Sequence, residues 1–118
     1  MFLKLNHQKL DVYRISRQFV FECYKLTQDL PVKEKFGMIT QIRRAALSVH
    51  LNIAEGATRK SPAERKRFYE IARGSIIEID GALDIANDLN HVKEEKARNL
   101  VVLVVNCFKT LAGMINPK

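Results

Sequence analysis

Residues 41–81 read QIRRAALSVHLNIAEGATRKSPAERKRFYEIARGSIIEIDG and contain the end of one helical pattern and the start of the next. Gly56 follows the first pattern, and we expect it to end that helix, because glycine enters the left-handed C′ conformation without steric cost. Ser61-Pro62-Ala63-Glu64 is typical of a capping box, in which the Ser61 hydroxyl accepts from the Glu64 amide. Pro62 then occupies the first helical position, where no amide hydrogen is needed. The stretch therefore predicts two consecutive helices joined by a short connection.

Cations concentrate where these two helices are expected to meet. The cations are Arg59, Lys60, Arg65, Lys66 and Arg67, and Glu64 is the only acid among them. The first turn of a helix already carries the positive end of the helix dipole, so cations there are locally unfavourable. A polyanionic partner would offset that cost, which makes this segment the first candidate for a binding site. Basic surfaces also serve solubility, and that alternative stays open at this point.

The whole chain has 118 residues, enough for one hydrophobic core, and we expect a single domain over residues 1–118. Its net charge of +7 favours nucleic acid or another anionic surface as a partner. The positive excess is uneven, because residues 68–90 carry five acids against Arg73 alone. A uniformly basic surface is therefore excluded.

Three features bear on the compartment. Cys23 and Cys107 each lie in an apolar stripe, so we expect them to be buried and reduced, with a disulfide as the alternative. Residues 1–6 lack the apolar segment of a signal peptide. The longest apolar run, residues 100–105, is far shorter than the ~20 residues that span a bilayer. We expect a cytoplasmic protein that does not bind a membrane.

Apolar residues recur at spacings of three and four, which predicts helices at about residues 8–29, 34–55, 62–89 and 93–115. The expected core positions are Val12, Ile15, Phe19, Cys23, Leu26 and Leu30, then Ile42, Ala46, Val49 and Ile53, then Phe68, Ile71, Ala72, Ser75, Ile79, Ala82, Leu83 and Ala86, then Ala97, Leu100, Val101, Val104, Phe108, Leu111 and Ile115. Residues 100–105 also fit a buried strand, but the helical spacing extends well beyond strand length. Short connections favour an all-α, antiparallel up-down-up-down four-helix bundle.

The second and third helices each show a further apolar side. Leu47, Leu51 and Ala54 form one such set, and Gly74, Ile77, Gly81 and Ile85 form the other. A helix with two apolar faces needs two partners, so we expect copies of the chain to associate. Two glycines seven residues apart indicate close approach of another helix, since glycine costs about 1 kcal/mol in a helix interior. Glycines tolerated on a solvent face are the alternative.

Residue patterns for catalysis or metal binding are missing. The three histidines lie in separate segments, neither cysteine has a nearby ligand partner, and no nucleotide-binding loop or nucleophile motif occurs. Asp80, Asp84 and Asp88 share one helix face, and a solvated acidic face explains them better than a metal site. We therefore expect no catalytic residue, no metal and no cofactor.

Polar residues also occur on the second and third predicted helices, between their apolar positions. Glu55 lies in a last helical turn, where the dipole repels anions, so it needs neutralisation from Arg44, Arg59 or another helix. We expect a buried network at a subunit boundary that fixes register and oligomer state. Its members are Arg44, Ser48, Asn52, Glu55, Gly74, Ser75 and Glu78. The alternative for Glu55 is a solvated carboxylate paired loosely with Arg59.

Several of these segments resemble the bacterial 23S rRNA intervening-sequence protein family, also called four-helix-bundle or S23 ribosomal proteins. The matching residues are Leu10 to Tyr13, Gln41 to Ala46, Asn52 to Gly56, Arg59, Ser61, Phe68, Ile71 to Ser75 and Glu78. The resemblance covers nearly the whole chain and implies a four-helix bundle that assembles into a homopentameric ring. The chain also resembles, more remotely, the accessory protein of diversity-generating retroelements, a basic pentamer that binds nucleic acid. Lys66-Arg67-Phe68-Tyr69 is more basic than the corresponding run of the family.

Three functions follow from these observations. The first is a non-catalytic, oligomeric module that binds RNA or DNA, with phosphate contacts from Arg43, Arg59, Lys60, Arg65, Lys66 and Arg67. Tyr69 alone is placed to stack on a base, because Phe68 lies on the core stripe, so binding should be largely independent of sequence. The second is a protein-interaction scaffold that docks a polymerase or a ribosome-associated partner. The third, an enzyme with a site in the bundle core, has the least support.

Overall fold

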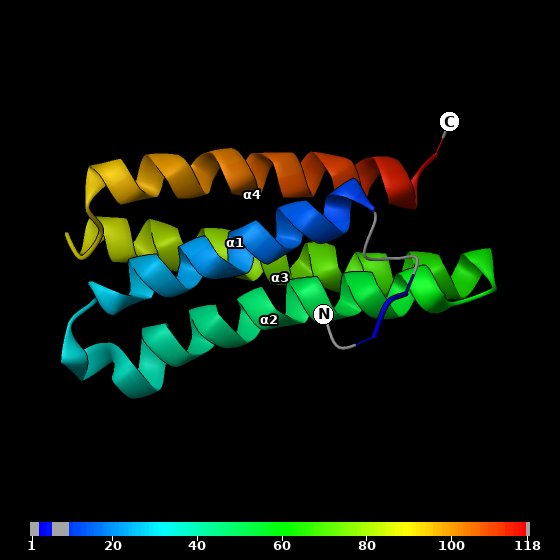
Figure 1. Ribbon diagram of the computed structural model, residues 1–118. Coiled ribbons are helices and arrows are strands. Elements are labelled where there is room, and N and C mark those ends of the chain that lie inside the picture. The colour runs from blue at the N-terminus through cyan, green and yellow to red at the C-terminus, as the bar shows by residue number, and fades with distance from the viewer. Residues whose placement is uncertain (1–2, 6–9, 118) are drawn as a thin grey trace.

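The structure is a computed structural model that describes residues 3–5 and 10–117. Within these residues the α-helices are α1 (Asp11–Gln28), α2 (Thr40–Thr58), α3 (Pro62–Asp88) and α4 (Glu94–Ile115). α1 packs against α2 and α4, and α3 packs against the same two helices, so the four form an antiparallel bundle (Figure 1). The described residues form no strand, and the predicted all-α bundle is confirmed for the single chain. The predicted start of the first helix at residue 8 lies outside the described residues.

The connection between α1 and α2 is helical but not α-helical. Val32–Glu34 forms a 3₁₀ turn (η2) and Lys35–Ile39 forms a π turn (η3), so α2 begins at Thr40 and not at about residue 34. In a π turn the carbonyl partner lies five residues back. The Thr40 hydroxyl donates to the Lys35 carbonyl across that spacing. Apolar residues keep a helical spacing through residues 32–39, so the sequence pattern could not distinguish the π turn from an α-helix.

Gly56 does not end α2 in the left-handed conformation, and that prediction is wrong. α2 continues to Thr58, and Gly56 is buried without a positive φ. A Cβ at this position would lie 2.8 Å from Cε1 of Tyr69 and 3.0 Å from Cβ of Phe68. Glycine is needed here because α3 approaches the α2 backbone so closely that no side chain fits.

The start of α3 follows the predicted capping. The Ser61 hydroxyl accepts a 3.4 Å hydrogen bond from the Glu64 amide, and Pro62 is the first helical residue. At the other end Asn90 has φ 59°, the His91 amide donates to the Ala86 carbonyl and the Asn90 amide to the Asn87 carbonyl. This is the bond pattern of a Schellman cap, with asparagine in the position that glycine usually fills.

All four α-helices contribute to one core. The predicted α2 stripe of Ile42, Ala46, Val49 and Ile53 is fully buried. The α3 prediction was wrong in part, because Ile71 is 42% exposed while Tyr69 and Ile76 are buried. On α4, Leu100, Leu111 and Ile115 are buried as expected, whereas Val101 and Phe108 are exposed at 54% and 38%. Cys23 and Cys107 are free and buried, and burial raises the pKa of each thiol to about 12.

The second apolar faces of α2 and α3 are open to solvent in the single chain. Leu47, Leu51, Ile77 and Ile85 are exposed. A Cβ on Gly74 or Gly81 would meet no atom of residues 3–5 and 10–117 within 4 Å. These glycines therefore make no close approach to another helix of the same chain.

Alanine substitutions at Gly56 and Gly74 form a matched pair that tests the packing of α2 against α3. We expect Gly56→Ala to lower the free energy of unfolding by about 1–3 kcal/mol, because the buried Tyr69 ring must move. Gly74→Ala should raise it by up to ~1 kcal/mol, because alanine favours the helix and finds open space. Urea unfolding measures both. Equal stabilisation by the two substitutions would contradict the close contact at Gly56.

α4 has the length and hydropathy of a membrane span: 22 residues, with a mean hydropathy of 1.4 over its most apolar window. The uninterrupted apolar run of residues 100–105 is short, but the mean over the helix also includes the apolar residues on either side of isolated polar ones. Core helices of bundles meet the same criterion, and α4 buries Leu100, Cys107, Leu111 and Ile115. The criterion alone is therefore weak support for a span.

Candidate nucleic-acid interface

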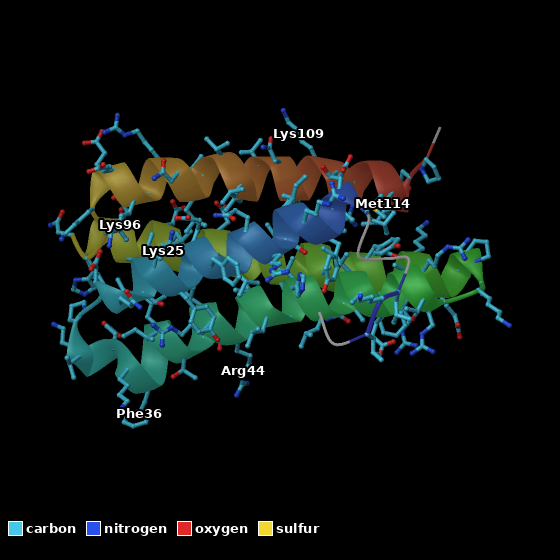
Figure 2. All side chains as sticks on the ribbon, viewed as in Figure 1. Lys25, Phe36, Arg44, Lys96, Lys109 and Met114 are labelled. Carbon is cyan, nitrogen blue, oxygen red and sulfur yellow. The ribbon has the colours of Figure 1, made fainter. Side chains whose placement is uncertain are left out.

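The connection between α2 and α3 brings five cations together at one end of the bundle. We call this set, Arg59, Lys60, Arg65, Lys66 and Arg67, the basic junction. Arg65 is half-buried and the other four are exposed. Figure 2 shows nitrogen-tipped side chains extending outward at the end where α2 and α3 meet. The capped turn at Ser61 and the short loop place the end of α2 beside the first turns of α3, which is why the charges converge.

Arg65 has a structural role within the basic junction. Its Nη1 atom donates to the carbonyls of Arg59 and Lys60, and both hydrogen bonds measure 2.8 Å. Arg65 therefore fixes the shape of the loop, and the sequence did not distinguish it from the four exposed cations.

Two guanidinium groups lie near the ring of Phe68. The Cζ atoms of Arg59 and Arg67 lie 5.0 Å and 5.8 Å from the centre of the Phe68 ring, and the ring is half-buried. Arg59 also forms a 2.9 Å ion pair with Glu55, and both of these side chains are largely exposed. Such an exposed pair is weak, so a phosphate can replace the carboxylate at small cost. Sequence analysis placed Phe68 only in the core, although the adjacent Arg67 was a signal for this contact.

Two of the predicted nucleic-acid contacts do not belong to the basic junction. Arg43 precedes Arg59 by sixteen residues of α2, a distance of ~24 Å along the helix. Its Nε donates to the Thr27 hydroxyl at 2.8 Å, and its guanidinium lies 4.7 Å from the centre of the Tyr24 ring. Arg43 thus ties α2 to α1. Tyr69 is only 5% exposed and packs on Gly56, so it is not placed to stack on a base.

Part of the predicted polar network forms across the contact between α2 and α3. The Ser75 hydroxyl donates to the Ser48 hydroxyl at 2.9 Å, and Nδ2 of Asn52 donates to the Ser48 carbonyl at 2.8 Å. Glu78 accepts a 3.0 Å hydrogen bond from Gln41 further along the same contact. Glu55 pairs with Arg59 and does not meet Ser48 or Asn52.

Two other predicted members of this network are solvent-facing. Arg44 extends outward from α2 (Figure 2), and Gly74 lies on the exposed side of α3. For Glu55 the structure therefore gives the alternative interpretation, the exposed pair with Arg59, at least within one chain. Across residues 3–5 and 10–117, no group of three or more His, Cys, Asp or Glu side chains is placed to hold a metal ion.

The protein is thus of the antiparallel four-helix-bundle class, with polar contacts between α2 and α3 and a cluster of cations at one end. Residues 8–113 match the family of 23S rRNA-intervening sequence proteins, and the chain belongs to this family. The fold is similar to a crystal structure from Bacteroides thetaiotaomicron VPI-5482, described as a protein with unknown function from the S23 ribosomal protein family. The TM-score is 0.81 at 24% sequence identity, over 89% of this chain and 98% of that chain. A comparison with curated protein sequences finds no match.

Proposed function

We propose that the protein is a non-catalytic homo-oligomer, a pentameric ring, that binds the backbone of RNA or DNA through the basic junction. The observation that carries this proposal is the exposure of Arg59, Lys60, Lys66 and Arg67 together at one end of the bundle. Between residues 55 and 67 the acids are Glu55 and Glu64, and both are exposed. The ion pair of Glu55 with Arg59 is exposed and therefore weak. The description of the family favours RNA as the ligand.

Association of copies supports the same function. Each basic junction alone makes few phosphate contacts, and linked sites bind far more tightly than single ones because the later contacts are intramolecular. The uncovered Leu47, Leu51, Ile77 and Ile85 supply apolar surface for such association. The resemblance noted above adds the ring and its five copies. We place this activity in the cytoplasm, away from membranes.

The salt dependence of binding tests the proposal. Affinity for a fluorescent single-stranded RNA, measured by anisotropy at several salt concentrations, should fall linearly on a log–log plot. Neutralising Lys60, Lys66 and Arg67 to glutamine should make that slope shallower by at least about 2, since each phosphate contact contributes ~0.7 for single strands. A slope near zero for the unaltered protein would refute backbone binding.

The matched control removes the same charge elsewhere. Lys25, Lys93 and Arg98 are exposed and lie toward the opposite end of the bundle, so their change to glutamine should leave the slope nearly unchanged. If both triple variants weaken binding equally, the basic junction is not the site. Light scattering at micromolar concentration tests the assembly, and a monomer would remove the ring from the proposal.

A further inference from the structure

An open apolar groove separates α3 from α4. Two adjoining hollows of about 240 and 340 Å³ share Asp80, Val104 and Val105, so they form one continuous depression. We call it the α3–α4 groove; its apolar walls are Ile77, Leu83, Val101, Val104, Val105 and Phe108. Ile77 and Val101 are 57% and 54% exposed. The groove therefore presents apolar surface that this chain does not cover.

The rim of the groove is acidic near the turn between α3 and α4. Asp80 and Asp84 border the first hollow, while Asn87 and Val92 line its end beside the turn. The second hollow has Asp80 and Lys109 at its edge. A partner for the first hollow is thus expected to carry an apolar tip flanked by cations.

The same chain carries such a tip in the connection between α1 and α2. Phe36 and Val32 are 90% and 85% exposed, the highest values among the large apolar side chains that the structure describes. Lys33 and Lys35 lie between them in the chain, on either side of Glu34, and Nζ of Lys35 lies 5.5 Å from the centre of the Phe36 ring. Figure 2 shows Phe36 extending into solvent on the side of the bundle away from α4. We call residues 32–36 the Phe36 knob.

The knob has an ordered backbone and lies near the turn that follows α3. The 3₁₀ and π turns order its backbone, and Oε2 of Glu34 lies 3.7 Å from Nε2 of His91 in the turn after α3. The knob and the acidic end of the groove therefore lie at the same end of the bundle. They lie on opposite sides of it, because α1–α2 and α3–α4 are opposite edges of the four-helix square.

We propose that the Phe36 knob of one copy docks in the α3–α4 groove of the next, with Lys33 and Lys35 facing Asp80 and Asp84. The inference rests on the proposed homo-oligomer and identifies its contact. Two different surfaces on opposite sides of a subunit make a head-to-tail contact, which generates a ring or an open chain of copies. In a closed ring of this kind the same rotation relates each copy to the next, so all copies have equivalent orientations about the ring axis. All basic junctions then gather on one rim, where a single polyanion can reach several of them.

The test compares assembly of single-site variants by sedimentation velocity at micromolar concentration. We expect Phe36→Ala to weaken assembly at least tenfold while leaving the melting temperature of the subunit unchanged, because the side chain it removes is exposed. Phe21→Ala, which removes an exposed phenylalanine from α1, is the matched control and should assemble normally. Asp80→Lys combined with Asp84→Lys should weaken assembly to a similar degree.

Mixing the two defective proteins gives the sharper result. Phe36→Ala retains an intact groove and the double aspartate variant retains an intact knob, so equal amounts should form a heterodimer that neither forms alone. An assembled Phe36→Ala protein, or a mixture that stays monomeric, would overturn the knob-and-groove contact while leaving nucleic-acid binding and the oligomer untouched. A monomeric unaltered protein would overturn the proposed oligomer itself, and this contact with it.

Discussion

Phe19→Ala is expected to lower the free energy of unfolding by about 3–5 kcal/mol. Phe19 is completely buried in the centre of α1 and faces the core that all four α-helices share. Its truncation removes the transfer free energy of the ring and leaves a cavity that well-packed neighbours fill only in part. Domains of this size have stabilities of about 5–15 kcal/mol, so the loss is a large fraction of the total. The melting temperature should fall by roughly 10–20 °C.

The same helix provides the control for this prediction. Phe21 is two residues further on and 48% exposed, with the Arg17 guanidinium 5.6 Å from its ring centre. Phe21→Ala should change the free energy of unfolding by ~0.5 kcal/mol or less. Urea titrations of both variants, fitted with a common slope, decide the matter. If both substitutions have the same small effect, the orientation of α1 in the bundle is wrong.

The two cysteines should resist alkylation about 1,000-fold in the folded protein at pH 8. Only the thiolate reacts, and burial raises the pKa of Cys107 from 9.0 to about 12; burial, with Glu22 and Cys107 nearby, does the same for Cys23. A rise of three pKa units lowers the thiolate fraction at pH 8 by about 1,000-fold. Iodoacetamide labelling followed by mass spectrometry, with and without denaturant, measures the ratio. Rapid labelling of either cysteine under native conditions would contradict its burial.

The same pKa shifts predict the response to alkali. Between pH 9 and pH 12 the unfolded thiols have lost their protons while the folded thiols retain them, so unfolding releases protons. The free energy of unfolding must therefore fall as the pH rises above about 9. Cys23→Ala should reduce this slope, although it also removes core volume. A slope that stays unchanged when both cysteines are replaced would assign the alkaline sensitivity to other groups.

Local features of the fold were predictable because they depend on near neighbours in the chain. The Ser61 cap was recognised from its residue types, and the α2 stripe of Ile42, Ala46, Val49 and Ile53 was recognised from its spacing. Gly56 was recognised as special but for the wrong reason. Glycine is required at this position because the ring of Tyr69, on another helix, leaves no room for a side chain. Rules of local backbone conformation cannot predict such a contact.

The face of α3 that points inward was not decided by the sequence. Ala72 and Ile79 follow helical spacing with Phe68, Ile71 and Ser75, which is the predicted core set, and equally with Tyr69 and Ile76. Both sets are apolar enough to form a core, so periodicity alone cannot choose between them. Packing against α2 and α4 buried Tyr69 and Ile76 together with the predicted Ala72, Ser75 and Ile79, and it left Ile71 at the surface. The same choice converted Tyr69 from an expected base contact into a core residue.

The position of the candidate site in the chain was predictable from sequence, but the partners of its side chains depend on the tertiary structure. Charge counting identified residues 59–67, because five cations so close together cannot be separated by folding. It could not reveal that Arg65 donates to the loop carbonyls, or that Arg43 is engaged by Thr27 and Tyr24 on α1. A guanidinium has several donors, and which acceptors it meets depends on residues far away in the chain.

The sequence by itself determined four helices, a capped boundary and a basic connection, because helical hydrogen bonds, caps and charge density depend on residues within about one turn of each other. Tertiary structure alone decided which side chains of α3 are buried, which partners Arg65 and Glu55 contact, and that Phe36 and the α3–α4 groove are both exposed. These depend on which surfaces the helices bury against each other. That choice minimises exposed apolar area over the whole bundle and has no local signature in the chain.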